Sequence, residues 1–289
     1  YKNHMIKQAI IPLAGLGTRM LPLTSVMPKE LLPINGKPNV EYILDECIEA
    51  GINKFIFIIS KKKENIKKYF FSDKLYKKLI KKSKNKKILA EFKKIKKYQK
   101  MIKFVYQDHP KGTGDAVLKC KKHITGKYFL MLLPDDLIIK KNCTKEMINL
   151  FNKKKTSIIA TKKVHKKTVS RWGILSVKNK KKSYFQIKNV FEKPSIKNAP
   201  SNYAIIGRYI LPYKIFSEIK KLKPGQGGEI HITDAIKSLI LKGNDFFAKI
   251  FGGKYLDCGT LKGYIESGIK IAKEKKWNCA WLEQAMLVL

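Results

Sequence analysis

The stretch Gln8-Ala9-Ile10-Ile11-Pro12-Leu13-Ala14, near the start of the chain, is followed directly by Gly15-Leu16-Gly17-Thr18-Arg19. Its apolar residues predict a buried strand, and the two glycines predict a turn where that strand ends. Further along, apolar runs at residues 55–60 and 128–134 alternate with helical spacing, as at residues 39–50. Such alternation is typical of βαβ units. We therefore predict an α/β fold with a mainly parallel sheet.

A lysine-rich segment at residues 61–100 interrupts this alternation. It contains no proline or glycine, and its apolar residues recur every three or four positions. This spacing predicts two or three amphipathic helices rather than a linker. We find no internal repeat and no clear linker elsewhere. The chain is therefore predicted to be a single domain over residues 1–289, with residues 61–100 as a helical insertion.

Composition argues against several classes of protein. The 289 residues are 44% apolar and 29% charged, which allows a sizeable core and disfavours global disorder. The longest apolar runs are too short to span a membrane, and no export signal is visible. The residues before Met5 leave the natural start open. Five scattered cysteines form no C-x-x-C pair, which disfavours a structural zinc or disulfide scaffold and favours the reducing cytoplasm.

The net charge of +40, taken alone, suggests a nucleic-acid partner. However, only three of the 62 basic residues are arginines: Arg19, Arg171 and Arg208. Proteins that read phosphates and base edges usually exploit the planar fork of arginine. A lysine excess spread over every segment also follows when the coding DNA is rich in A and T. We favour this second interpretation and predict no nucleic-acid partner.

The glycine turn after the first strand is a candidate phosphate-binding loop. Glycines let backbone N–H groups approach phosphate oxygens, and ligands of α/β proteins bind at the carboxyl ends of strands. The loop is neither a Walker A motif nor a complete dinucleotide fingerprint, so a purely structural turn stays a real alternative. Arg19 and Lys29 would add two positive charges for a polyphosphate, although Lys29 alone could be an ordinary surface lysine.

Two neighbouring carboxylates, Asp135 and Asp136, follow the apolar run at residues 128–134. A hard cation such as Mg²⁺ is their natural partner, because it uses one or two carboxylates together with substrate phosphates. The alternative is that either aspartate caps the next segment. Asp257, before Gly259, is a similar carboxylate, but nothing in the sequence pairs it with Asp135.

Two further motifs suit a sugar phosphate, namely Arg171-Trp172-Gly173 and Glu192-Lys193-Pro194. A carboxylate accepts hydrogen bonds from sugar hydroxyls and a lysine neutralises phosphate, although each motif singly could be structural. The glycine-rich residues 223–230 are interpreted as a surface loop. The histidines form no metal or triad pattern, and no G-x-S-x-G elbow is present. Phosphoryl or nucleotidyl transfer is therefore favoured, since positioning and charge neutralisation can supply most of its catalysis.

Together the motifs resemble the sugar-nucleotide pyrophosphorylases, and most closely the bacterial UTP–glucose-1-phosphate uridylyltransferases. The glycine loop with Pro28-Lys29-Glu30 is shared across the nucleotidyltransferase superfamily. The narrower matches, within a likeness that runs from Lys7 to Leu282, are Lys111-Gly112-x-Gly114, Leu133-Pro134-Asp135-Asp136, Glu192-Lys193-Pro194, Ala199-Pro200-Ser201-Asn202, Gly207-Arg208-Tyr209, Pro224-Gly225-x-Gly227-Gly228-Glu229-Ile230-x-x-Thr233-Asp234-Ala235 and Asp257-Cys258-Gly259. The segment at residues 61–100 also resembles the uridylyltransferases, whereas the related thymidylyltransferases are shorter there.

This resemblance implies a Rossmann-like, mixed and mainly parallel sheet flanked by helices. It also implies that UTP and glucose 1-phosphate are joined with release of pyrophosphate. In that reaction, Arg19 and Lys29 would steady the triphosphate, Asp135 and Asp257 would hold Mg²⁺, and Lys193 would bind the sugar phosphate. The other implied contacts are Ala14, Gly15, Glu30, Gln107 and Gly112 for uridine, and Gly173 and Glu192 for the glucose hydroxyls.

One residue departs from the family pattern. Asp115 stands where the family usually has histidine, after Lys-Gly-x-Gly. A carboxylate beside the expected nucleotide pocket would weaken triphosphate binding or change the base preference, but we expect activity to survive. The alternatives are a thymidylyl- or adenylyltransferase, an inactive paralogue, and a nucleic-acid binder using the lysine-rich face. The family usually assembles into homodimers or homotetramers.

Overall fold

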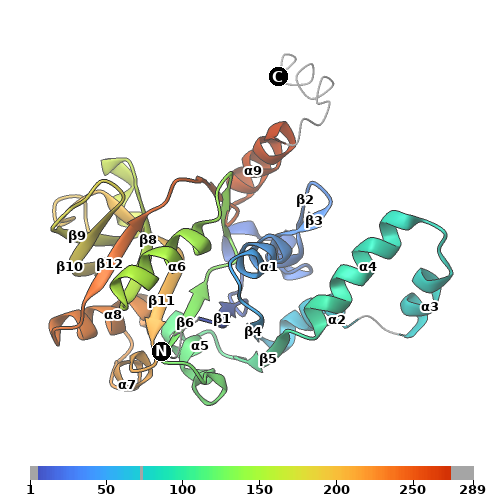
Figure 1. Ribbon diagram of the computed structural model, residues 1–289, viewed down its shortest axis with the longest axis horizontal. Coiled ribbons are helices and arrows are strands. Elements are labelled where there is room, and N and C mark those ends of the chain that lie inside the picture. The colour runs from blue at the N-terminus through green and yellow to red at the C-terminus, as the bar shows by residue number, and fades with distance from the viewer. Residues whose placement is uncertain (1–5, 72–73, 275–289) are drawn as a thin grey trace.

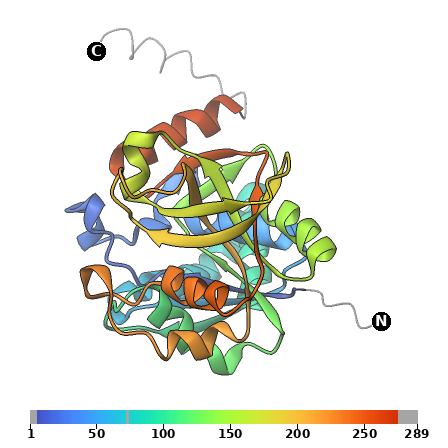
Figure 2. The ribbon, with the colours of Figure 1, turned by 90° about the vertical axis from the view of Figure 1, so that its left-hand side faces the viewer.

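The computed structural model describes residues 6–71 and 74–274, which form a central sheet between two layers of helices (Figures 1 and 2). The strands are β1 Gln8–Pro12, β2 Pro33–Ile34, β3 Lys37–Pro38, β4 Lys54–Ile59, β5 Ile102–Tyr106, β6 Tyr128–Leu132, β7 Asp136–Ile139, β8 Ser157–Lys163, β9 Gly173–Lys178, β10 Tyr184–Glu192, β11 Tyr203–Pro212, β12 Phe246–Ile250 and β13 Lys254–Asp257. The helices are α1 Asn39–Glu49, α2 Glu64–Phe70, α3 Lys74–Lys82, α4 Lys86–Gln99, α5 Thr113–Lys119, α6 Cys143–Lys154, α7 Ile215–Ile219, α8 Ile232–Leu241 and α9 Leu261–Glu274. Three features discussed from the sequence lie outside the described residues: the residues before Met5, Cys279, and Leu282, where the family resemblance ends.

The main sheet has the strand order β5-β4-β1-β6-β11-β8-β12-β10-β9. It is parallel from β5 to β6 and between β8 and β12, whereas its other neighbouring strands are antiparallel. The predicted α/β fold class is confirmed, although the described sheet is mixed, with four parallel and four antiparallel neighbouring pairs, rather than mainly parallel. Its parallel half carries the glycine loop. Among the described residues, no helix is both long enough and apolar enough to cross a membrane.

The core lies on both faces of the sheet, as the alternation of side chains along β4 shows. Phe55, Phe57 and Ile59 point into one hydrophobic cluster, and Ile56 and Ile58 point into the other. Helices α1, α6 and α9 cover the first cluster, and α5, α7 and α8 cover the second (Figure 2). A strand buried on both faces reads as a continuous apolar run, which is why β4 and β6 were evident in the sequence.

The lysine-rich segment forms helices α2, α3 and α4, which project from the body beside β5 (Figure 1). This confirms the predicted amphipathic helices. Ile66 and Phe70 of α2 and Ile95 and Tyr98 of α4 attach this arm to the first cluster. The assignment of residues 1–289 to a single domain stays a prediction.

A small ribbon of β7 and β13 was missed in the sequence. The two strands pair antiparallel, with Asp136 opposite Asp257. In the main sheet, the antiparallel pair β9–β10 sets Gly173 opposite Glu192. The first register brings together two residues more than a hundred positions apart, and both pairs face the site described next.

Candidate active site

Two adjoining cavities open at the carboxyl ends of β1 and β6. These strands pair in parallel, so the glycine loop after β1 and Asp135 after β6 meet at one edge of the sheet. The cavities measure about 240 and 340 Å³ and share the lining residues Thr113, Leu133, Asp135 and Glu229. Every residue predicted for the site lines one of them. The arrangement places Asp135 on a common wall between two binding spaces.

The smaller cavity is lined by all five residues expected to hold a nucleoside, together with Lys29. These five are Ala14, Gly15, Glu30, Gln107 and Gly112. The two glycines of the loop serve different purposes. A Cβ on Gly15 would meet nothing within 4 Å, so the backbone there is open to a ligand, whereas Gly17 has φ +69° and forms the turn.

Glu30 is not a free carboxylate in this cavity. It is only 1% exposed, and its two oxygens accept hydrogen bonds from Lys63 Nζ at 2.9 and 2.8 Å. Burial lowers the pKa of Lys63, although the neighbouring Glu30 charge opposes this. Lys63 lies where the lysine-rich segment begins and was missed in the sequence, because nothing distinguishes it from its neighbours Lys61 and Lys62.

The segment before α8 packs directly on Gly112 and Gly114. Ile230 donates its backbone N–H to the Lys111 carbonyl at 2.8 Å and accepts one from Gly114 at 2.7 Å. A Cβ on Gly112, where φ is +97°, would come within 2.6 Å of the Ile230 carbonyl oxygen. These glycines therefore allow a close backbone contact, which holds the adjacent Glu229 at both cavities.

Asp135, on the wall shared by the two cavities, forms ion pairs with two positively charged side chains. Its Oδ2 lies 2.7 Å from Lys29 Nζ and 3.4 Å from Arg19 Nη2. Burial alone would raise the pKa of Asp135, but the Lys29 ammonium and the Arg19 guanidinium hold it below its usual value. Arg19 itself is 58% exposed, which leaves most of its guanidinium accessible.

Asp135 and Asp257 converge on one small space beside Gly259. A Cβ built on that glycine would lie 2.7 Å from Asp135 Oδ2 and 3.2 Å from Asp257 Oδ1. In the described part of the chain, no cluster of three or more His, Cys, Asp or Glu side chains could hold a metal. Two carboxylates suit Mg²⁺, which completes its octahedron with water and substrate phosphate oxygens. The residues present therefore fit a divalent cation of this kind.

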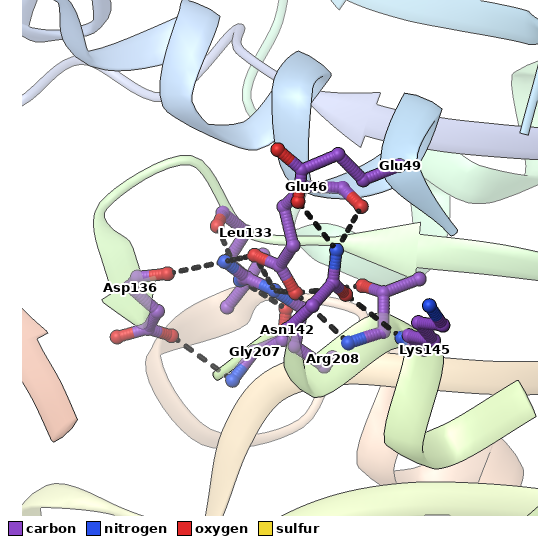
Figure 3. Close-up of polar contacts among 9 residues, drawn as sticks. Glu46, Glu49, Leu133, Asp136, Asn142, Lys145, Gly207 and Arg208 are labelled. Carbon is purple, nitrogen blue, oxygen red and sulfur yellow. Dashed lines mark hydrogen bonds and ion pairs between the residues drawn. The ribbon is translucent and has the colours of Figure 1, made fainter. Parts of the chain in front are cut away.

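Asp136 and Arg208 hold the loop that carries Asp135 (Figure 3). Asp136 accepts from the Gly207 N–H at 3.0 Å and from the Tyr255 hydroxyl at 2.6 Å. Burial, with the neighbouring Asp135 charge, raises the pKa of Asp136 to about 6. Arg208 donates to the carbonyl oxygens of Leu133 at 3.1 Å and Asp136 at 2.5 Å.

The charge of Arg208 is balanced entirely inside the protein. Its side chain is 0% exposed, and its Nη2 lies 2.9 Å from Oε2 of Glu46 in α1. Nε of Arg208 donates to both carboxylate oxygens of Glu46 at 3.2 and 3.3 Å. Glu46 is fixed in turn by hydrogen bonds from the backbone and the hydroxyl of Thr144. A buried, satisfied ion pair therefore connects two helices to the loop at Asp135.

The larger cavity gathers the residues expected to bind a sugar phosphate. Gly173, Glu192 and Lys193 line it with Arg19 and Asp257. Glu192 Oε2 accepts from the Thr233 hydroxyl at 2.8 Å, and a Cβ on Gly173 would be 3.4 Å from the same oxygen. The cavity thus places a carboxylate acceptor and a lysine at adjacent positions.

Other residues also line the larger cavity. Arg171 was placed in a sugar-phosphate motif from the sequence but given no role of its own, and Thr233, Tyr255 and Glu229 were assigned none. Arg171 is 58% exposed, and its Nη2 lies 4.0 Å from Asp257 Oδ2. Its rarity was a usable signal, since two of only three arginines in the chain line this cavity.

Comparisons with known proteins agree with this geometry. The profile of the nucleotidyl transferase family matches residues 8–274. The UTP–glucose-1-phosphate uridylyltransferase of Bacillus subtilis is 38% identical over 94% of this chain and 92% of its own length. That of Mycoplasma pneumoniae is 36% identical over 92% of each chain.

Solved structures show the same relationship. A UDP-glucose pyrophosphorylase crystallised with UDP-glucose is 36% identical, has a TM-score of 0.84 and aligns over 93% of this chain and all of its own. A UTP-bound UGPase from Acinetobacter baumannii is 31% identical, with a TM-score of 0.87 over 99% of this chain and all of its own. The chain therefore belongs to the nucleotidyl transferase family, and within it to the UTP–glucose-1-phosphate uridylyltransferases.

Proposed function

We propose that this protein transfers the uridylyl group of UTP to glucose 1-phosphate, giving UDP-glucose and pyrophosphate. The observation that carries the proposal is the pair of adjoining cavities with Asp135 on their common wall. Relatives that align over more than nine-tenths of their own length carry this activity in their names, and similar structures were solved with UTP and with UDP-glucose. One cavity suits a nucleotide and the other a sugar phosphate.

In this mechanism an oxygen of the sugar phosphate attacks the α-phosphorus of UTP. The bond from that phosphorus to the bridging oxygen breaks, and pyrophosphate leaves in line. Arg19 and Lys29 stabilise the negative charge that develops on pyrophosphate, and Lys193 orients the attacking phosphate. The nucleoside lies against Ala14, Gly15, Glu30, Gln107 and Gly112, where Lys63 holds the Glu30 carboxylate. Gly173 and Glu192 position the glucose hydroxyls.

Nucleotidyl transferases are generally metal-dependent, and for this chain we propose Mg²⁺ held by Asp135 and Asp257. Bound there, the cation supplies charge neutralisation between the two phosphate groups. The convergence of both carboxylates beside Gly259 supports this assignment. We also propose a cytoplasmic homodimer or homotetramer, acting on these two substrates and on no nucleic acid. The free, buried state of the four described cysteines is consistent with the cytoplasm.

The direct test is pyrophosphate release with glucose 1-phosphate and Mg²⁺, offering UTP, dTTP, ATP, CTP and GTP in turn. We expect release with UTP to exceed release with CTP, ATP and GTP by a wide margin, and EDTA to abolish it. Release that strongly favours ATP would keep the chemistry but contradict the uridylyl assignment. Absence of release with every nucleotide would contradict the proposed activity.

A second expected result concerns Lys193. Lys193→Ala should raise the KM for glucose 1-phosphate about 10- to 100-fold, because it removes a charged partner of the sugar phosphate. The KM for UTP should change little, since Lys193 lies outside the nucleotide cavity. Lys188→Ala is the matched control, because Lys188 is exposed on strand β10, which ends one residue before Lys193. An equal rise in both KM values would argue against the assignment.

A further inference from the structure

Asp115, the residue that departs from the family pattern, faces the side chain of Gln107 and does not line either cavity. It lies in the first turn of α5, where a carboxylate is favoured by the helix dipole. Gln107 Nε2 donates to Asp115 Oδ2 at 2.6 Å and to the Gly112 carbonyl oxygen at 3.3 Å. Gln107 is 4% exposed and lines the smaller cavity. Asp115 therefore stands behind a residue of the cavity wall.

This contact determines which way the amide of Gln107 points. An ionised carboxylate and a backbone carbonyl only accept hydrogen bonds, so the amide nitrogen must face both of them. The opposite orientation would set Oε1 of Gln107 against two oxygen acceptors. A histidine at position 115 would impose no such constraint, because an imidazole can either donate or accept.

The amide oxygen of Gln107 is consequently left for a ligand. None of the described residues donates a hydrogen bond to Gln107 Oε1. This oxygen is also not sealed from solvent, unlike the fully buried polar atoms that lack a partner. It is therefore reachable from the cavity that Gln107 lines. The wall presents a hydrogen-bond acceptor at this point, and the matching ligand group is an N–H donor.

We propose that Asp115 is a positioning residue that fixes Gln107 as an acceptor toward the base and thereby selects uracil over cytosine. The inference rests on the proposed function, in which this cavity takes the nucleoside. Uracil carries an N3–H donor, whereas cytosine has an acceptor lone pair at N3. An acceptor on the cavity wall forms a hydrogen bond with uracil N3–H and repels the lone pair at cytosine N3. A site built to hydrogen-bond one polar group strongly rejects an analogue that lacks the group. Thymine carries the same N3–H donor as uracil, so this contact does not distinguish dTTP from UTP.

The test is the ratio of kcat/KM for UTP to kcat/KM for CTP in the Asp115→Asn variant. An asparagine both donates and accepts, so only the longer contact to the Gly112 carbonyl oxygen, at 3.3 Å, then opposes a turn of the Gln107 amide that offers N–H to cytosine N3. We expect the ratio to fall at least about 10-fold, mainly through a lower KM for CTP. The ratio of kcat/KM for dTTP to that for UTP should not change. Asp245→Asn is the matched control, since Asp245 accepts from Gln186 Nε2 at 2.7 Å in an exposed pair outside both cavities. An unchanged ratio in folded Asp115→Asn, or an equal loss of both nucleotides, overturns the proposal.

A measurement on the unsubstituted protein covers the case in which the variant does not fold. N3-methyl-UTP lacks the N–H donor, and we expect it to bind at least about 10-fold more weakly than UTP in calorimetry. Equal binding of the two would overturn the proposal. If the protein binds UTP in preference to CTP, loses that preference in Asp115→Asn, but releases no pyrophosphate, the proposed function fails and the inference about Asp115 stands. If it is active with UTP but does not distinguish these nucleotides, only the inference fails.

Discussion

Asp135→Asn should lower pyrophosphate release at least about 100-fold while the protein stays folded. The substitution removes the negative charge that Lys29 and Arg19 bind on the wall shared by the two cavities. Removing one charge-stabilising group from an active site commonly costs 100- to 1,000-fold in kcat. The measurement is pyrophosphate release under saturating UTP and glucose 1-phosphate, with thermal unfolding recorded on the same samples.

Asp45→Asn provides the comparison for this result. Asp45 also accepts hydrogen bonds from two lysines and a tyrosine, Lys37, Lys94 and Tyr98, but it lines neither of the two site cavities. We expect this variant to lose some stability and to keep its activity. Retained activity in Asp135→Asn would contradict both the metal assignment and the placement of the reaction at this wall.

Arg208→Met should lower the free energy of unfolding by about 3–5 kcal/mol, because it leaves the Glu46 carboxylate buried and unpaired. It should also lower activity, since the carbonyl oxygens of Leu133 and Asp136 lose their donor on either side of Asp135. Urea denaturation measures the first effect and pyrophosphate release the second. Arg171→Met is the control for stability, because Arg171 is an exposed arginine whose ion pair is 4.0 Å long.

The double variant Glu46→Leu with Arg208→Met separates the two roles of the arginine. Removing both charges should restore part of the lost stability, since no carboxylate is then left unpaired. It should not restore activity, because the loop at Asp135 still lacks its donor. Recovery of full activity in the double variant would show that Arg208 contributes only to stability.

Much of the fold was predictable because its signals are local. Strands β4 and β6 are buried on both faces and read as unbroken apolar runs, and the helical spacing of α2 to α4 is visible along the lysine-rich segment. The ribbon β7–β13 was not predictable in the same way. Each of its strands has four residues, and the pairing joins positions more than a hundred residues apart. The side chains of such short strands carry too little periodicity to be recognised.

The candidate site shows a similar division. The site residues were chosen from sequence motifs, and the structure brings all of these chosen residues to two adjoining cavities. Their partners could not be chosen, because Lys63, Thr233 and the Asp115–Gln107 pair depend on tertiary contacts. The burial of Arg208 could not be predicted from the composition either. Arginine is ordinarily a surface residue, and only the structure shows that this one is buried against Glu46.

The ion pair between Lys63 and Glu30 has a consequence for how this protein can change in evolution. Lys63 lies at the root of the helical arm, yet it neutralises a carboxylate inside the nucleotide cavity. A deletion that removed the arm together with Lys63 would leave the Glu30 carboxylate buried and unpaired in the cavity that we propose for the nucleotide. A protein of this fold with a shorter arm and a glutamate at position 30 would therefore need a cation from another element to pair with that carboxylate.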